Sequence, residues 1–182
     1  IKVVNPDILT LNECWDATPD TITKLFVHHF PNSNWYATKN DEGNITVSKY
    51  PILNSINIQK KARITANYIQ YKHDTVLVLN VHFSCCDKDK ERAAEVAYVL
   101  KYIQSLKNNP KTKSQNYPLI IMGDYNFVGE ADQLEALLNG QKEKPDWDNT
   151  SLTNLKAFQV NSNFSYTWYD EKSDYSPGKL DY

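Results

Sequence analysis

The chain has 182 residues, with 20 lysines and arginines against 22 aspartates and glutamates, so its formal charge is −2. Hydrophobic residues make up 41% of it and charged residues 23%, proportions that are typical of a globular domain and exclude a disordered or fibrous protein. The longest strongly apolar stretches, 76–79 and 119–122, are far too short to cross a bilayer, so no integral membrane segment is expected. The balanced charge argues against a polybasic protein that grips nucleic acid through bulk charge.

The chain opens with a predicted strand followed by a predicted helix. Residues 7–13 alternate in pattern, and Glu13 ends the face that carries the two leucines. A hydroxyl, a proline and an acid at 18–20 are typical of a helix N-terminus, and the helix must end before Pro31. The predicted buried face of this helix consists of Ile22, Leu25, Phe26 and His29.

Three more strands are predicted at 45–48, 63–71 and 75–83. The last of them is apolar on both faces near its start, so we expect it to be buried on both sides. Near its end Asn80 and His82 point in the same direction, because they are two residues apart on a strand. They belong either to a site beyond the strand end or to a structural hydrogen-bond network.

The second half continues the alternation. It contains a predicted helix at about 90–106, a strand at 118–122, a short helix that ends at Gly140, a polar segment at 141–163 and a strand pattern at 166–169. The apolar stripe of the longer helix is predicted at Ala93, Val96, Ala97, Leu100 and Ile103, and that of the shorter one at Leu134, Leu137 and Leu138. Strands interleaved with helices predict a layered α/β enzyme.

Acids and amides follow several of these strands. Asp124 and Asn126 share a face after a glycine that permits a tight turn, and an Asx turn is the structural alternative. Glu13 alone favours a solvated strand edge over a functional role, and Asp181 alone indicates little. Together, carboxylates with an amide and a histidine form an oxygen-rich site suited to Mg²⁺ or Mn²⁺. Such a site has the parts needed to hydrolyse a phosphate ester.

In this order the motifs resemble the endonuclease/exonuclease/phosphatase superfamily. The segments that carry the resemblance are PDILTLNE ending in Glu13, ITVSKYPI around Lys49, LNVH ending in His82, GDYN at 123–126, YTW at 166–168 and KLDY at Asp181. They extend over nearly the whole chain. The resemblance implies one domain over 1–182 with a deoxyribonuclease I-like fold, a four-layered α/β sandwich of two packed β-sheets flanked by helices.

The resemblance also implies a role for each motif residue. Glu13 would bind the metal, and His82 would hydrogen-bond the scissile phosphate. Asp124 would position or deprotonate the attacking water, while Asn126 would help to orient that water and stabilise the transition state. Asp181 would hold the ring of a second histidine.

The remaining motif residues are assigned to substrate binding. Asn80 would support the site from the same motif as His82. Lys49 stands where the family often has arginine, as a structural residue or an electrostatic aid rather than a catalyst. Tyr166 and Trp168 either stack on the substrate or pack against the protein.

The sequence departs from the family pattern at both ends. The expected N-terminal strand with its asparagine and the C-terminal Ser-Asp-His segment are both absent from the chain. We therefore expect a fragment of a longer chain. A complete chain of this length would be expected to be inactive or nearly so, because removing a principal proton-transfer or charge-stabilising group costs on the order of 10² to 10⁴ in rate. Likeness to exported bacterial members favours an extracellular location.

The function expected from these residues is metal-dependent cleavage of a phosphodiester, nucleic acid or a small-molecule or lipid diester, by in-line attack of water. A lipid substrate would require an exposed apolar or aromatic loop. The loop that contains Trp147 could supply one, but the aspartates on both sides of this tryptophan disfavour its insertion into a membrane. The alternative is a non-catalytic binding module, which would not need a metal at Glu13. Cys85 and Cys86 are expected as two thiols, with a vicinal disulfide as the alternative. Oligomeric state is left open.

Overall fold

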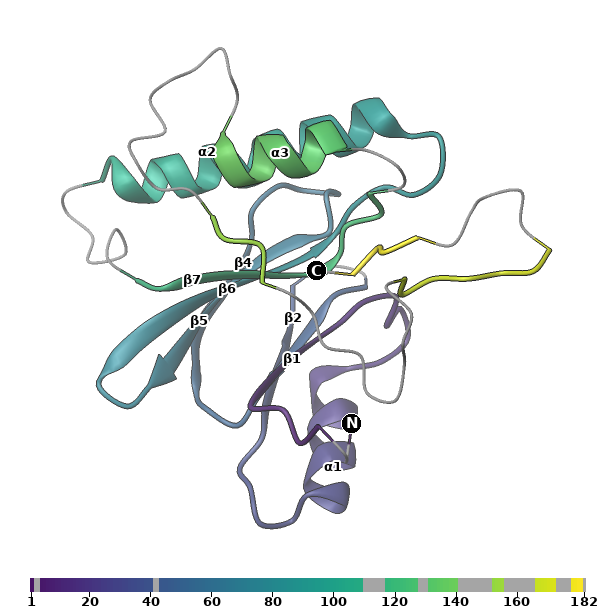
Figure 1. The fold of residues 1–182 in the computed structure, drawn as a ribbon. Coiled ribbons are helices and arrows are strands. Elements are labelled where there is room, and N and C mark those ends of the chain that lie inside the picture. Colours follow the sequence, from purple (N-terminus) through teal and green to yellow (C-terminus); the bar gives the residue numbers. More distant parts are fainter. Residues whose placement is uncertain are drawn as a thin grey trace.

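The computed structural model describes residues 1, 4–40, 43–109, 117–127, 131–140, 152–155, 166–172 and 178–181. The described elements are β1 (Ile8–Leu11), α1 (Pro19–His29), β2 (Tyr36–Lys39), β3 (Ile45–Ser48), β4 (Ile52–Asn57), β5 (Ile64–Tyr71), β6 (Asp74–His82), α2 (Asp89–Lys107), β7 (Leu119–Asp124) and α3 (Ala131–Asn139). Two sheets pack together, α1 lies on the smaller one, and α2 and α3 cover the outer face of the larger one (Figure 1). This arrangement confirms the predicted four-layered α/β sandwich.

The two sheets differ in how their strands are connected. The smaller sheet is antiparallel in the order β1-β3-β2, and the larger has the order β4-β5-β6-β7. In the larger sheet only the β6–β7 pair is parallel, with α2 forming the crossover between them. Parallel pairing brings the carboxyl ends of β6 and β7 together and sets His82 opposite Asp124. The topology therefore places two of the motif residues, His82 and Asp124, side by side at the carboxyl ends of these strands.

The N-terminal helix follows its sequence signals at both ends. The Thr18 hydroxyl accepts a hydrogen bond from the backbone N–H of Thr21 (3.2 Å), and the helix ends at His29, before Pro31. Its buried residues are Ile22 and Phe26, which pack on Ile45 and Val47 of β3. Leu25 and His29 are exposed, contrary to the prediction, because the three-stranded sheet beneath α1 is too narrow to cover a wider stripe.

The buried face of α2 also differs from the prediction. Val96, Leu100 and Ile103 are buried as expected, but Ala93 is exposed and Ala97 is only half-buried. Arg92 and Glu95 are buried in their place, because they hold the loop that leads out of β6. Arg92 donates to the carbonyls of Ser84 and Cys86 at 2.8 and 2.9 Å, and Glu95 accepts from the Ser84 N–H at 2.7 Å. Hydrogen bonds to the preceding loop, rather than apolar packing, therefore determine which side chains are buried near the N-terminus of α2.

Strand ends and connections supply the other differences. The strand predicted at 7–13 ends at Leu11, and β2 and β4 were not predicted, since neither has a clear alternating pattern. The short helix α3 occurs as predicted, with Gly140 in the left-handed region (φ 78°) directly after it. Leu137 is buried and Leu134 and Leu138 are half-buried. In the predicted last strand, only an isolated bridge joins Trp168 to Gly178.

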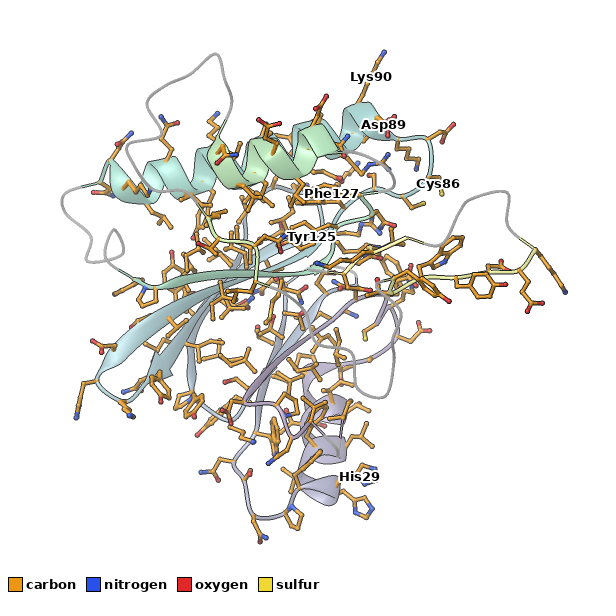
Figure 2. All side chains as sticks on the ribbon, viewed as in Figure 1. His29, Cys86, Asp89, Lys90, Tyr125 and Phe127 are labelled. Atoms are coloured by element: carbon orange, nitrogen blue, oxygen red, sulfur yellow. The ribbon has the colours of Figure 1, made fainter. Side chains whose placement is uncertain are left out.

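The central strands β3, β5 and β6 have one face in an apolar core and carry buried polar side chains on the other. The apolar core between the larger sheet and its helices includes Leu79, Val81 and Phe83 of the β6 region, and Tyr125 and Phe127 join it after β7 (Figure 2). The space between the two sheets is instead rich in buried polar side chains. These are Asn44, Thr46, Ser48, Thr65, Asn67 and Asn80. We call this set the polar layer.

Candidate active site

Three motif residues meet where β1, β6 and β7 end. His82 is 3% exposed, and its Nε2 lies 3.9 Å from a carboxylate oxygen of Glu13 and 3.9 Å from one of Asp124. The Glu13 side chain is 70% exposed, so one side of this cluster opens to solvent. The structure therefore brings together the predicted metal ligand, phosphate-binding group and water-positioning group.

The polar layer sets the positions of these residues. The Asn12 amide nitrogen donates to Asn44 Oδ1 at 2.9 Å and to Asn80 Oδ1 at 3.0 Å, which ties β1 to both sheets. The Asn12 oxygen accepts from the backbone N–H of Asp124 at 3.2 Å. Asn80 also donates to the carbonyl of Ile45 at 3.1 Å. Asn80 is therefore a support of the site, buried behind it, rather than a group that faces solvent.

Lys39 fixes the loop that carries Glu13. Its ammonium group donates to the carbonyls of Cys14, Trp15 and Ala17 at 2.7 to 3.0 Å. The Cys14 N–H reaches the carbonyl of Gly43 at 2.9 Å, next to the start of β3. The carboxylate of Glu13 consequently extends from an anchored turn although its own side chain is exposed.

Arg63 is the group that the motif analysis missed. One guanidinium nitrogen lies 3.2 Å from Nδ1 and 3.3 Å from Nε2 of His82, and the other donates to the carbonyl of Phe83 at 3.3 Å. Arginine has no acceptor, so a hydrogen bond here requires a neutral imidazole, whose one unprotonated ring nitrogen accepts from Arg63. The available signal was an arginine, after two lysines, directly before a strand whose partner strand ends in a histidine, and it becomes recognisable only with the register of β5 on β6.

Burial and charge shift the pKa values of His82 and Asp124. Burial, assisted by the Arg63 guanidinium, lowers the pKa of His82 to about 4. Burial, assisted by the neighbouring carboxylates of Asp181 and Glu13, raises the pKa of Asp124 to about 6. At pH 7 the imidazole is neutral, so its 3.9 Å approaches to the carboxylates are dipolar contacts rather than ion pairs. The cluster is left with negative charge that a cation could neutralise.

The GDYN segment forms the Asx turn and also contributes to the site. Oδ1 of Asp124 accepts from the Asn126 N–H at 3.0 Å, and Oδ2 is the oxygen near His82. The Asn126 amide is buried and donates to the carbonyl of Phe83 at 2.9 Å. Gly123 is needed because a Cβ there would lie 2.1 Å from the backbone oxygen of Val81. The Asx turn and the contribution to the candidate site are therefore features of one local structure rather than alternatives.

The C-terminal residues reach the same edge. Asp181 forms an isolated antiparallel bridge with Asp124, and the Tyr125 N–H donates to the carbonyl of Leu180 at 2.8 Å. The Thr167 hydroxyl accepts from the N–H groups of Leu180 and Asp181 at 2.9 and 3.2 Å. Thr167 is a second residue that the motif analysis missed.

The other predicted substrate-binding residues lie apart from the cluster or beside it. Lys49 follows β3 at the end opposite to Glu13, bonded to Asp7 at 3.1 Å and lying over the Trp35 ring at 5.5 Å, so the structure gives it a packing role. Tyr166 and Trp168 are half-buried on either side of Thr167. Trp147 lies outside the described residues. Cys85 and Cys86 are both free thiols, with their sulfur atoms 2.7 Å apart.

Backbone conformation marks the site as well. Glu13, Arg63 and Asn126 have φ values of 58°, 46° and 51°, in the left-handed region that few non-glycine residues adopt. Each such residue costs on the order of 1 kcal/mol and persists where the surrounding contacts fix it. The site holds three of the seven such residues among those described, and the other four are Asn5, Lys61, Lys72 and Cys86.

The sequence profile of the Endonuclease/Exonuclease/phosphatase family matches residues 1–182. The chain belongs to this family. Membership agrees with the convergence of Glu13, His82 and Asp124, and it supports a phosphohydrolase in general terms. None of the curated proteins compared with the chain matches it.

Solved structures with the same fold include several members of this family. A beta toxin structure from Staphylococcus aureus has a TM-score of 0.64 and 20% identity, covering 100% of this chain and 73% of the toxin. The human Nocturnin catalytic domain, with a bound sulfate anion, has a TM-score of 0.57 and 18% identity over 76% of this chain and 58% of its own. The Bacteroides thetaiotaomicron mannosyl-6-phosphatase Bt3783 has a TM-score of 0.55 and 15% identity, covering 75% and 57% of the two chains. At these identities the likeness establishes the fold alone.

No helix among the described residues is long and apolar enough to cross a membrane.

Proposed function

We propose that this protein is a metal-dependent hydrolase of phosphodiesters, which attacks phosphorus in line with water. The observation that carries the proposal is the meeting of a buried neutral histidine with three carboxylates and one guanidinium at a single sheet edge. Hydrolysis of a phosphate ester needs positive charge or donors for the phosphoryl oxygens and a carboxylate for the water. Family membership supports the same class of reaction.

The residues present fit Mg²⁺ or Mn²⁺. In the described part of the chain no three His, Cys, Asp or Glu side chains form a closed cage. Magnesium needs only one or two carboxylates, because it keeps waters and takes substrate oxygens as its other ligands. Glu13 would hold the ion through its exposed carboxylate, and the ion would supply positive charge to the phosphoryl oxygens. A beta toxin variant from Staphylococcus aureus with the same fold has been seen with bound magnesium ions.

The chain's own side chains would share the remaining work. The Arg63 guanidinium and the imidazole of His82 would contact phosphate oxygens, and a bound phosphate would raise the pKa of His82 toward protonation. Oδ2 of Asp124 would orient the attacking water and accept its proton, which a raised pKa makes more favourable. The backbone N–H of Asn126 would keep Oδ1 of the same carboxylate in place. Asp181 would hold the ring of the second histidine that the family resemblance implies.

The substrate is proposed only as a class. The charge balance gives no support for processive binding along a duplex, so a short nucleic acid and a small-molecule or lipid diester are equally compatible with the site. The proteins with similar folds are named for different activities, which is expected when substrate choice depends on loops around a common site.

The direct test is hydrolysis of bis-p-nitrophenyl phosphate with Mg²⁺ or Mn²⁺, measured on this chain and on any longer natural protein that contains it. We expect turnover that disappears with a chelator and in the Asp124→Asn variant. Thermal unfolding with and without metal gives a second readout, which Glu13→Gln should abolish. Absence of both turnover and a metal-induced rise in Tm would contradict the proposal and favour the binding module.

A further inference from the structure

A cleft of about 460 Å³ lies on the side of the sandwich away from the carboxylate cluster. It is formed by α1, by β2 at the edge of the smaller sheet and by β4 at the edge of the larger one. Because β3 separates β2 from β1, the cleft is about 10 Å, two strand spacings, from the strand that leads to Glu13. None of its lining residues belongs to the candidate active site. A volume of this size is within the range of pockets that bind small molecules.

The chemistry of the lining is neutral and polar. Hydroxyls come from Thr23, Tyr36 and Thr38, and amides come from Asn40 and Asn54. No lining residue in the described part of the chain carries a charge, so an anion or a cation would find no counter-charge here. Few aliphatic groups are present, which disfavours an apolar side chain or an acyl group as the occupant.

These polar groups are not used by the protein itself. Among the described residues no hydrogen bond engages the hydroxyls of Thr23, Tyr36 and Thr38 or the amide nitrogens of Asn40 and Asn54. The contrast is Ser55, whose hydroxyl at the floor of the cleft is bonded to Asn67 at 2.6 Å. Several convergent, uncommitted donors and acceptors in one hollow are what a ligand with many hydroxyls would require.

Trp35 provides an independent observation. It lines the cleft, is 5% exposed, and packs on Phe26 and Phe30. Its indole Nε1 is buried, and the described part of the chain gives this donor no acceptor. A buried N–H without a partner costs about 1 to 3 kcal/mol. A ligand oxygen would satisfy it after a small tilt of the ring, of the kind that side chains commonly make on binding.

From these observations we infer that the cleft between α1, β2 and β4 binds a neutral saccharide. A sugar presents hydroxyls that both donate and accept, together with a C–H face that packs on aromatic rings, and it carries no charge. Tyr36 supplies an exposed aromatic ring, the buried Trp35 supplies an N–H donor, and the threonines and asparagines supply further hydrogen bonds. This binding is independent of phosphate ester hydrolysis, because it uses none of the residues proposed for that reaction.

The test is a titration of the ¹⁵N-labelled chain with maltose, cellobiose and diacetylchitobiose, observed through the tryptophan indole N–H resonances. The chain has four tryptophans, and Trp35→Phe identifies the signal of interest. We expect the Trp35 indole signal to shift saturably with at least one disaccharide at concentrations up to about 20 mM. This range extends above the millimolar Kd that a few hydrogen bonds would give. The other indole signals should stay in place.

Variants that keep the fold sharpen the test. Thr38→Val and Asn54→Ala change exposed or half-buried side chains, and each should weaken binding about fivefold to tenfold. Gln70→Ala removes an exposed amide on β5, outside the cleft, and should leave binding unchanged. The proposal is overturned if no disaccharide shifts the Trp35 signal, if the two variants bind as tightly as the original chain, or if inorganic phosphate alone gives the same shift. No outcome depends on turnover, so failure here leaves the proposed hydrolase unaffected.

Discussion

Toward its C-terminal end β6 has an apolar outer face and a polar inner face, although both faces are apolar near its start. Leu77, Leu79 and Val81 point toward α2 and α3 and form part of the apolar core. Asn80 and His82 point between the sheets, where Asn80 belongs to the polar layer and His82 to the carboxylate cluster. Burial is complete on both sides, so exposure does not distinguish the faces.

The difference lies in what each face specifies. Apolar packing is non-directional and tolerates exchange between side chains of similar volume. The polar layer consists of directional bonds, such as Asn12 to Asn80, and each buried group that loses its partner destabilises the fold. We therefore expect changes to the outer face to alter mainly stability, and changes to the inner face to alter activity as well.

The largest effect is expected at the end of the inner face, in Asp124→Asn. Asparagine keeps an oxygen to accept the Asn126 N–H but cannot take a proton from water, so turnover should fall by about 10³. Stability at pH 8 should be unchanged or higher, because the change removes a carboxylate crowded by Asp181 and Glu13. Diester hydrolysis and urea unfolding of the metal-free protein measure the two effects. Asp74→Asn, an exposed acid at the other end of β6, is the matched control and should affect neither.

The next largest effect is a loss of stability expected from a substitution at the pairing of β6 with β7. Gly123→Ala would place a Cβ against the backbone oxygen of Val81 in a left-handed conformation, which should cost on the order of 4 kcal/mol. Gly43→Ala is the control, because the atoms nearest to its Cβ would belong to the Trp15 side chain, which is 48% exposed and able to move. Urea unfolding should separate the two variants by about 3 kcal/mol. Equal stabilities would contradict the close approach of β6 and β7.

Two substitutions at neighbouring positions of β6 test whether its outer and inner faces differ in this way. Leu79→Ala should cost about 2 to 5 kcal/mol through the cavity it leaves, while folded molecules keep their turnover. Asn80→Ala should cost about 1 to 3 kcal/mol and also lower turnover about tenfold, because Asn12 loses a partner and holds Asp124 less firmly. Unfolding curves and kcat, measured at a temperature where both variants are folded, distinguish the cases. Equal losses of kcat would refute the division between the two faces.

A smaller effect is expected from Arg63→Gln. Removing the guanidinium should raise the pKa of His82 above about 4, and burial should still keep it below 6.5. Turnover should fall about tenfold to a hundredfold through loss of a phosphate contact. An NMR titration of the histidine ring protons reports the pKa. Lys61→Gln removes a nearby but exposed charge, and it should not move the His82 titration.

The smallest effect is a pair of opposite pH dependences in the metal-free protein. The folded-state pKa of His82 lies below 6.5, so its contribution to stability increases as the pH rises from about 4 to 6.5. The folded-state pKa of Asp124 lies above 3.8, so its contribution decreases as the pH rises from about 4 to 6. We expect Asp124→Asn to become more stable with rising pH in this interval and His82→Gln to become less stable. Urea unfolding at pH 4.5, 5.5 and 6.5 shows whether the two slopes have these signs.

The sequence by itself determined the elements that depend on local chemistry. The Thr18 cap, the stop before Pro31, the alternation along β6 and the Asx turn at Asp124 are set by residues within a few positions of one another. The order of the motifs was enough to indicate the family and the four-layered fold. Glu13, His82 and Asp124 could be selected because each follows an apolar strand. That the three side chains lie close together was only an expectation until the structure showed it.

Other features depended on tertiary structure, because they arise between segments far apart in the chain. Arg63 lies against His82 through the pairing of β5 with β6, and Asn12 reaches Asp124 across 112 positions. The strand that was predicted to reach Glu13 ends at Leu11, and Glu13 has a left-handed backbone conformation. Arg92 is buried on α2 where an alanine was predicted, because its guanidinium donates to the carbonyls of Ser84 and Cys86 and to Gln133, which is 41 positions away. Local periodicity records which residues avoid water, whereas hydrogen bonds between strands decide which polar groups are buried and therefore where the chemistry can occur.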